Sequence, residues 1–291
     1  LNHFNISRSS LPTVKPSLSI FARETEIFGD VPISAVLGDQ QASLFGHNGI
    51  FKGSIKNTYG TGCFLLCNTG TDIVKSTSGL LTTVAYQLEN EPPVYALEGS
   101  VAIAGASIQW LRDNLGIINT SSDVEKLSLE VKDNGDVYFV PAFSGLFSPH
   151  WDPTARGTIV GLTRYSNKSH IARAVLESVA FQTNDVLSAL SKDLKQDQLV
   201  LSVDGGMVNN NLLMQYQSDI SNIQVQAPKL NEITAYGAAL ASYVFIKKID
   251  LKSIPSSNKR DQTWSPNMSE QKRENYLISW NKAIEKAKNW L

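Results

Sequence analysis

Apolar runs that alternate with amphipathic stretches over the second half of the chain constrain its fold most. A helical pattern at 170–190 precedes a β-rich apolar run at 199–203, and a second helical pattern follows at 210–220. A strand-like run at 223–225 then leads into an Ala-rich helical stretch at 234–245. This order is typical of βαβ units. We therefore predict an α/β fold with a mixed sheet flanked by helices on both faces.

The first half of the chain carries shorter strand-like runs separated by Gly, Asn and Pro turns, which is typical of antiparallel hairpins. These strands are expected at 57–60, 64–68, 80–86 and 94–99. Other strands are expected at 31–37, 137–140 and 158–161, and other helices at 39–45, 101–115 and 270–291. The predicted organisation is a connector with a surface helix at 1–30, one lobe at 31–250, and a carboxy-terminal region at 251–291 that contains a surface loop (256–272) and a docking helix (270–291).

The composition limits the classes of partner. The formal net charge is −1 over 291 residues, which indicates neither nucleic acid nor an anionic membrane as a partner. No apolar run approaches the ~20 residues that span a bilayer. Cys63 and Cys67 lie in an apolar segment and the four His residues are scattered, so we expect reduced core thiols and no metal site. This pattern favours a cytoplasmic protein.

Three glycine-containing turns are the candidates for chemistry, because Walker, dinucleotide-binding and serine-hydrolase motifs are absent from the sequence. Asp39 follows a glycine at the expected end of a strand, where a carboxylate can accept a hydroxyl proton, as phosphoryl transfer requires. Two glycines flank Thr61, whose hydroxyl can donate to an anion. Gly205 and Gly206 separate an apolar run from a helix that starts near Asn210, so the backbone there can approach a nucleotide.

Each of these turns also has a purely structural interpretation. Asp39 is a suitable helix N-cap, and the motif alone favours capping over catalysis. The glycines around Thr61 fit an ordinary hairpin turn, and capping by Asn210 is as plausible as nucleotide binding. His170 is interpreted as a helix-start residue rather than as a base. Single motifs therefore leave the function open.

Taken in order, the motifs resemble the carboxy-terminal lobe of the glycerol kinases, a branch of the FGGY family of carbohydrate kinases. The likeness runs from about residue 32 to about residue 242 with few gaps, and so many motifs in order are highly specific. The matching stretches are Gly38-Asp39-Gln40-Gln41-Ala42, Asn57-Thr58-Tyr59-Gly60-Thr61-Gly62-Cys63-Phe64, Gly79-Leu80-Leu81-Thr82-Thr83, Ala96-Leu97-Glu98-Gly99, Ile108-Gln109-Trp110-Leu111-Arg112-Asp113, Trp151-Asp152-Pro153 with Ala155-Arg156-Gly157, and a family signature that starts at Gly157.

The resemblance implies an actin-like ATPase fold, of the ribonuclease H-like type, in which this chain is the second of two lobes and 1–30 connects it to the first. It implies phosphorylation of glycerol to sn-glycerol 3-phosphate by ATP, with Mg²⁺ bridging the phosphates, in a protein that forms homo-oligomers. By the same resemblance Asp39 would be the general base, and it would contact glycerol together with Gln40 and Phe64. The residues that would contact the nucleotide are Thr61, Gly105, Gln109, Gly206 and Asn210.

Two departures from the family pattern lead to further expectations. The first lobe is not in this sequence, so we expect little or no kinase activity from the chain alone. Some bacterial members carry Gly-Gly-Arg where this chain has Phe28-Gly29-Asp30, and because Asp30 repels phosphate we expect no regulation by a sugar bisphosphate.

Two alternatives to a glycerol kinase stay open at this point. One is a non-catalytic module for nucleotide binding or protein contact, and the other is a kinase for another sugar or polyol, such as xylulose or gluconate. The intact Asp39 favours an enzyme, since only chemistry requires it. Phe64 and the Gly-Asp-Gln-Gln stretch favour glycerol.

Overall fold

The structure is a computed structural model that describes residues 1–24, 26–195, 199–254 and 260–291. Its strands are β1 (Ala22–Glu24), β2 (Val31–Ile33), β3 (Ile55–Tyr59), β4 (Cys63–Gly70), β5 (Leu81–Tyr86), β6 (Val94–Val101), β7 (Tyr138–Val140), β8 (Thr158–Val160), β9 (Val200–Asp204), β10 (Gln224–Pro228) and β11 (Arg260–Trp264). Its α-helices are α1 (Asp39–Gly46), α2 (Gly105–Asp113), α3 (Asp123–Ser128), α4 (Lys168–Leu194), α5 (Asn211–Ser221), α6 (Ile233–Lys247) and α7 (Glu270–Ala287). Short 3-10 turns lie at Asn2–Phe4, Arg8–Ser10, Gly206–Asn209 and Leu251–Ser253.

A seven-stranded mixed sheet organises the molecule, with the strand order β11-β10-β9-β3-β4-β6-β5. The strands β3, β4, β6 and β5 pair antiparallel, as the turn-rich first half of the sequence predicts. β9 runs parallel to both β3 and β10 after a long crossover that contains α4. The predictions of a mixed sheet and of hairpins in its first half are therefore confirmed.

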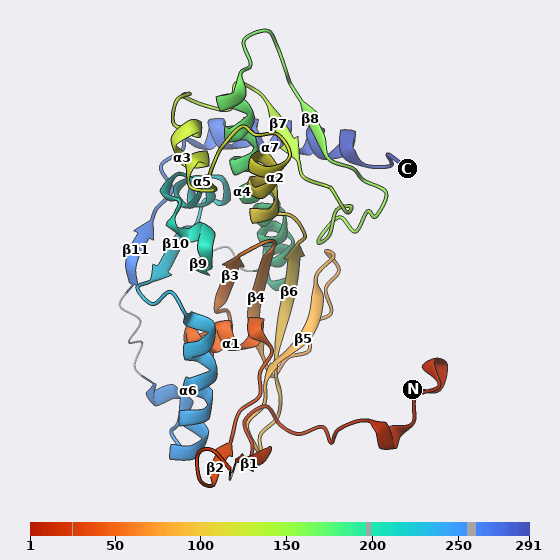
Figure 1. Cartoon of the computed structure of the whole chain (residues 1–291), viewed down its shortest axis with the longest axis vertical. Helices are drawn as coiled ribbons and strands as arrows, with labels where there is room; N and C mark the ends of the chain where they lie inside the picture. The colour runs from red at the N-terminus through yellow and green to blue at the C-terminus, as the bar shows by residue number, and fades with distance from the viewer. Residues whose placement is uncertain (25, 196–198, 255–259) are drawn as a thin grey trace.

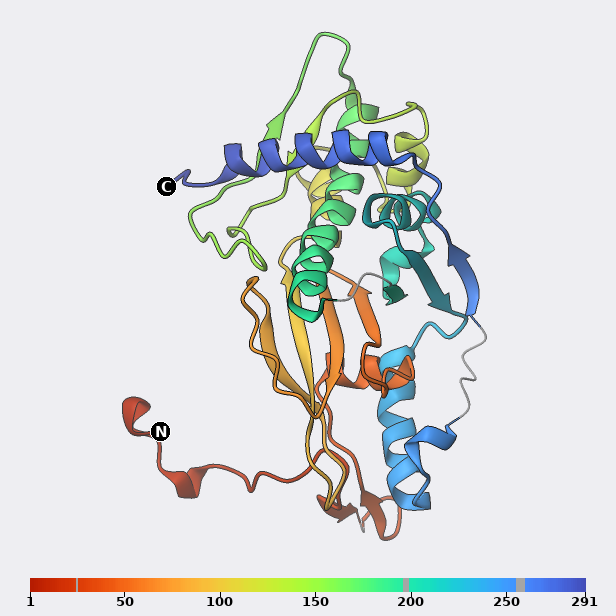
Figure 2. The ribbon, with the colours of Figure 1, turned by 180° about the vertical axis from the view of Figure 1, so that it is seen from behind.

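Helices cover both faces of this sheet (Figure 1, Figure 2). Side chains alternate along β4, so that Leu65 and Cys67 join the large core under α4, whereas Leu66 joins a smaller core with Phe45 of α1. α1 packs closely on α6, and both lie on the face opposite α4. Cys63 and Cys67 are buried free thiols, as expected.

α4 starts at a reciprocal cap. The Asn167 side chain accepts hydrogen bonds from the backbone N–H groups of Ser169 and His170, and His170 Nδ1 accepts one from the backbone N–H of Asn167. His170 is thus a helix-start residue, as the sequence predicted. The helix begins two residues before the predicted range because the cap lies in polar residues ahead of the apolar stripe.

The predicted buried strand at 31–37 is wrong. Only Val31–Ile33 is a strand, it pairs with β1 outside the main sheet, and Val31 and Ile33 are 46% and 47% exposed. Pro32 cannot donate to a sheet ladder, which confines such a strand to an edge. The surface helix expected in the first thirty residues is also wrong, because residues 1–24 and 26–30 contain only two 3-10 turns and the short strand β1. The amino-terminal end runs away from the body (Figure 1), whereas Leu18 is buried in the smaller core.

The carboxy-terminal region differs from the expected loop and helix. Residues 260–264, predicted as loop, form β11 at the edge of the sheet. The strand pairs antiparallel with β10, and Ser218 Oγ donates to the Trp264 carbonyl oxygen at 3.1 Å. Trp280 of α7 is buried and stacks on Phe181 at 4.9 Å between ring centroids, so α7 docks as predicted. It ends at Ala287, however, and Leu291 is exposed. The expected helix at 101–115 starts only at Gly105, because β6 extends through Val101.

Candidate active site

Asp39 is the first residue of α1, directly after the N-cap Gly38. It does not follow a strand of the main sheet, which corrects the sequence prediction, and Gly38 rather than Asp39 is the N-cap. Asp39 Oδ1 accepts the backbone N–H of Gln40 at 2.8 Å, and Oδ2 accepts Gln40 Nε2 at 3.2 Å. The positive end of the helix dipole favours an aspartate in the first turn. The side chain is exposed, so its carboxylate is accessible from solvent.

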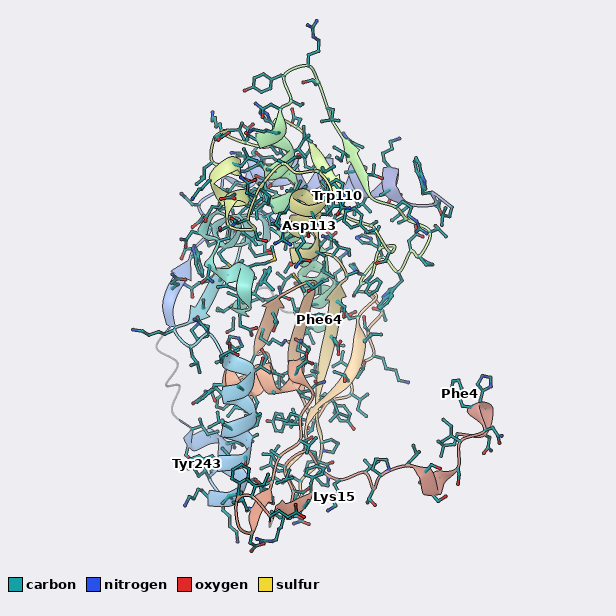
Figure 3. The ribbon with its side chains drawn as sticks, viewed as in Figure 1. Phe4, Lys15, Phe64, Trp110, Asp113 and Tyr243 are labelled. Atoms are coloured by element: carbon teal, nitrogen blue, oxygen red, sulfur yellow. The ribbon has the colours of Figure 1, made fainter. Side chains whose placement is uncertain are left out.

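Lys56 of β3 connects the two other residues expected to hold the polyol. Its ammonium donates to Gln40 Oε1, to Thr58 Oγ1 at 3.0 Å and to the backbone carbonyl oxygen of Phe64 at 3.2 Å. Phe64 lies on the neighbouring strand β4, opposite Thr58, and the residue is 37% exposed (Figure 3). The geometry therefore brings Asp39, Gln40 and Phe64 to one face of the sheet.

The Lys56 side chain is fully buried although it carries a charge. Burial lowers the pKa of Lys56 to about 8, against the opposing influence of the carboxylates of Asp204, Asp39 and Glu98. Burial in turn raises the pKa of Glu98, while the Lys56 charge opposes that shift. Sequence reasoning missed Lys56. The sequence gives no signal for it beyond its place between Ile55 and the stretch that begins at Asn57.

Asp204, at the end of β9 and directly before the glycine turn, belongs to the same set of polar contacts. Its Oδ2 accepts a hydrogen bond from Ser43 Oγ of α1 at 2.6 Å and lies 2.7 Å from Nε2 of His47, the residue directly after α1. Burial opposes ionisation of Asp204, but the contacts with His47 and Ser43 and the Lys56 charge hold its pKa below its ordinary value. Ser43 Oγ also lies 3.4 Å from Thr58 Oγ1. A continuous set of polar contacts thus runs from Asp204 to Asp39.

The glycine turn after Asp204 requires its first glycine. Gly205 has φ +98°, and a Cβ there would lie 2.3 Å from the Tyr59 carbonyl oxygen. Only glycine fits this combination of backbone conformation and close approach. A Cβ at Gly206, in contrast, would meet no atom within 4 Å, so this residue borders open space.

The five residues expected to contact a nucleotide line one cavity of about 450 Å³. Thr61 and Gly105 meet there because the hairpin between β3 and β4 docks on the start of α2, where the Gly60 carbonyl accepts the Gly105 N–H at 2.9 Å. Gln109 comes from the same helix, and Gly206 and Asn210 come from the turn before α5. Sequence reasoning missed other lining residues that carry no motif, namely Ser121, Ser122 and Glu125.

Asn210 has a structural function besides its place in the cavity. It is the N-cap of α5, and its Oδ1 accepts the Leu213 N–H at 2.8 Å. Glu125 Oε1 accepts the next backbone donor, the Leu212 N–H, at 3.0 Å. Capping uses the amide oxygen of Asn210, while the amide nitrogen is a hydrogen-bond donor. Both interpretations drawn from the sequence are thus compatible.

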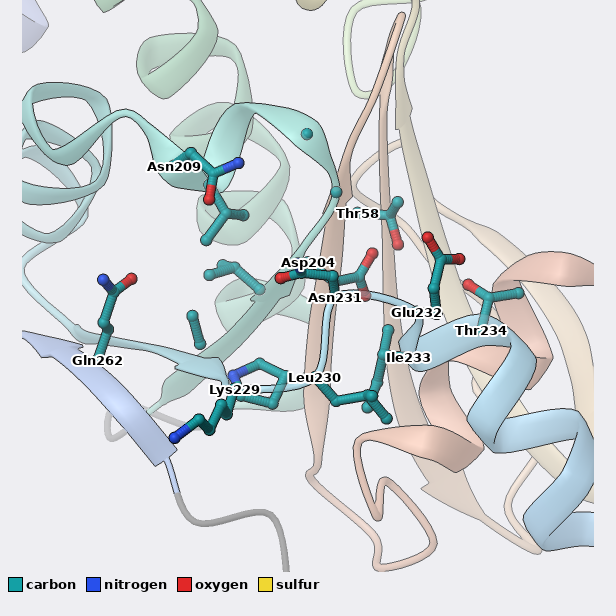
Figure 4. Close-up of a pocket in the computed structure, with 16 residues that line it drawn as sticks. Thr58, Asp204, Asn209, Lys229, Leu230, Asn231, Glu232, Ile233, Thr234 and Gln262 are labelled. Carbon is teal, nitrogen blue, oxygen red and sulfur yellow. The ribbon is translucent and has the colours of Figure 1, made fainter.

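A second cavity, of about 570 Å³, lies on the other side of the glycine turn (Figure 4). Gly206 and Asn209 line both cavities. Asp204 and the segment before α6, from Lys229 to Ile233, form much of its remaining wall. The turn between β9 and α5 therefore divides two spaces, only one of which the sequence indicated.

Within the described residues no group of three or more His, Cys, Asp or Glu side chains is placed to hold a metal ion. Isolated carboxylates such as Asp39 fit an ion that is held mainly by phosphate oxygens and water, which is the usual mode of Mg²⁺. No helix in the described part of the chain is long and apolar enough to cross a membrane.

The mixed sheet, its helical cover and the glycine turn beside a cavity are those of a lobe with the actin-like ATPase fold of sugar kinases. The family model of the FGGY family of carbohydrate kinases, C-terminal domain, matches residues 55–244. The chain belongs to this family.

Its relatives include the glycerol kinases of Clavibacter michiganensis and Chloroflexus aggregans, which are 49% and 50% identical to it over its whole length. The chain spans only 58% and 59% of those two proteins. The solved structure of Plasmodium falciparum glycerol kinase with ADP is 40% identical, with a TM-score of 0.88 over 96% of this chain and 56% of that one. The xylulose kinase of Lactobacillus acidophilus shares the fold at 23% identity and a TM-score of 0.82, over 98% of this chain and 58% of its own.

Proposed function

We propose that this chain is the nucleotide-side lobe of a kinase that transfers a phosphoryl group from ATP to glycerol, giving sn-glycerol 3-phosphate and ADP. The observation that carries this proposal is the gathering of Asp39, Gln40 and Phe64 on one sheet face, joined by polar contacts to the glycine turn of the nucleotide cavity. The glycerol kinases that are 49% and 50% identical to the chain support glycerol as the acceptor.

In the proposed reaction Asp39 accepts the proton of the attacking glycerol hydroxyl, and Gln40 and Phe64 hold the polyol. Thr61, Gly105 and the residues around Gly206 hold the nucleotide, which arrives as the MgATP substrate. Such catalysis relies mainly on positioning and charge neutralisation, and it requires a closed cleft. The first lobe supplies the other wall of that cleft. The domain limits, the cytoplasmic location, the homo-oligomer and the absence of sugar-bisphosphate regulation stay predictions.

The test uses a polypeptide in which this chain follows the amino-terminal region that its relatives possess. We expect ATP-dependent phosphorylation of glycerol, and we expect Asp39→Asn to lower kcat by ~10²–10⁴-fold, the usual contribution of a general base. The substitution should leave ADP affinity unchanged, because Asp39 lies outside the nucleotide cavity. The chain alone should bind ADP without transferring phosphate.

Two results would redirect the proposal. A two-lobed protein that binds ADP but phosphorylates nothing would identify the chain as a non-catalytic nucleotide-binding module. Phosphorylation of xylulose or gluconate in place of glycerol would keep the kinase and reject the acceptor.

A further inference from the structure

Lys56 contacts none of the groups expected to react, yet it is the most buried charge next to them. It projects from the centre of the sheet, from the strand β3, toward the amino-terminal end of α1. A lysine ammonium has three N–H donors and no acceptor. Here all three donors face oxygen atoms, those of Gln40, Thr58 and Phe64. Burial of such a group is unfavourable unless its hydrogen bonds are satisfied, so its place in the sheet calls for a specific explanation.

The Gln40 amide has two orientations of nearly equal shape, in which the oxygen and nitrogen exchange places. Lys56 selects one of them, because an ammonium can face only the amide oxygen. The amide nitrogen then faces Asp39 and donates to Oδ2 at 3.2 Å. In the opposite orientation the amide oxygen would face the carboxylate and the amide NH₂ would face the ammonium, and both contacts are repulsive. The charge on Lys56 thus determines which atom Gln40 presents to Asp39.

We propose that Lys56 is a positioning residue that holds Asp39 in its reactive geometry by fixing the orientation of the Gln40 amide. This inference rests on the proposed kinase function. Thr58 contributes to the same arrangement, because its hydroxyl accepts from Lys56 and lies 3.4 Å from Ser43 Oγ, which in turn donates to Asp204. The charged groups that face Lys56 are Asp39 of α1, Asp204 of β9 and Glu98 of β6.

The test is a steady-state comparison of Lys56→Met with wild type in the two-lobed polypeptide. Met has a similar length and no donor, and apolar replacements of buried charges often preserve folding. We expect kcat to fall by ~10–100-fold, since displacement of a reacting group by about 1 Å costs as much. The KM for ATP and the affinity of the chain for ADP should stay within about twofold, since Lys56 does not line the nucleotide cavity. Lys52→Met is the matched control, because Lys52 is an exposed lysine paired with Asp72, and it should change neither parameter.

A double-mutant cycle separates positioning from a general structural effect. If Lys56 acts through Gln40, then Lys56→Met should lower kcat by less than about threefold in a Gln40→Met background, because coupled residues are not additive. Additive losses would overturn the proposal, and so would a Lys56→Met enzyme with the kcat of wild type. If Lys56→Met does not fold, Thr58→Val replaces it, since it removes one acceptor from the ammonium without a change of size. An unchanged kcat in Thr58→Val would then overturn the proposal.

The failure of this inference can be distinguished from the failure of the proposed function. A wild-type two-lobed protein that binds ADP but transfers no phosphate refutes the function, and this inference with it. An active wild type whose kcat survives the loss of Lys56 refutes this inference alone.

Discussion

A substitution at Gly206 should change ligand binding without changing the stability of the fold. A Cβ at this position meets no protein atom within 4 Å, and the residue lines both cavities beside the glycine turn. Gly206→Val should therefore leave the fold intact, with a change in unfolding free energy within about 0.5 kcal/mol, as for most surface substitutions. Its side chain should instead occupy space that a nucleotide needs.

The magnitude follows from the volume of the cavity. Three added carbon atoms fill roughly the space of three water molecules, or about 90 Å³ at the ~30 Å³ share of each water. That is about a fifth of the 450 Å³ cavity that also holds Thr61, Gly105 and Asn210. Overpacking of this kind costs about 1–3 kcal/mol, which corresponds to a loss of ADP affinity of about 5- to 150-fold.

Isothermal titration of ADP into the chain, together with thermal unfolding of the same samples, measures both quantities. Gly205→Ala is the contrasting variant, because its Cβ would collide with the Tyr59 carbonyl oxygen and the φ of +98° strains any other residue. It should unfold at a clearly lower temperature than Gly206→Val. A Gly206→Val chain that binds ADP as tightly as wild type would show that the nucleotide does not lie beside this turn.

Two further substitutions test individual side chains. Asn210→Asp should keep the cap on the Leu213 N–H, and hence the Tm, but it should weaken ADP binding by about tenfold or more, because a donor is lost and a negative charge is added. Asn210→Ala should weaken ADP binding and also lower stability by about 1 kcal/mol. Equal ADP affinities for wild type and Asn210→Asp would contradict a contact between Asn210 and the nucleotide. Burial raises the pKa of Glu177 to about 7 despite its pair with Arg173, so the folded chain binds this proton more tightly than the unfolded chain. The free energy of unfolding should then fall as pH rises from about 4.5 to about 7, by up to about 3 kcal/mol, and stay level above that range. Urea unfolding of Glu177→Gln should lack this component, and a pH profile identical to that of wild type would refute it.

Local patterns predicted the parts of the fold that depend on neighbours in sequence. The hairpins β3–β4 and β5–β6 follow from turn residues between apolar runs, and α4 follows from an unbroken helical period. The sequence predictions failed for two strands at sheet edges. The segment 31–37 was expected to be buried because it is apolar, and 260–264 was expected to be loop because it is polar. The burial of an edge strand depends on which distant segment covers it, and the residues of the strand itself do not identify that segment.

The residues of the candidate site also fall into two groups, those that a local motif predicts and those that only tertiary contacts bring to the site. The glycine turns marked Thr61 and Gly206 because a close backbone approach demands glycine and leaves a visible motif. Glu125 of α3 and Ser121, which precedes that helix, line the cavity expected to hold a nucleotide. A pattern in their own segment cannot reveal that Glu125 contacts the start of α5. Lys56 was missed for a related reason, since its importance lies in three contacts that come from three different segments.

By itself, the sequence determined the class of fold, the helices and hairpins, and the turns at which chemistry is expected, because hydrophobic period and glycine conformation act over a few residues. Only the tertiary structure decided that Asp39 begins a helix rather than follows a strand, and that the buried Lys56 donates a hydrogen bond to Gln40. It also decided that one set of polar contacts runs from Asp39 to Asp204, beside the glycine turn. These features depend on burial and on hydrogen bonds between α1, β3 and β9, which become neighbours only when the sheet has formed.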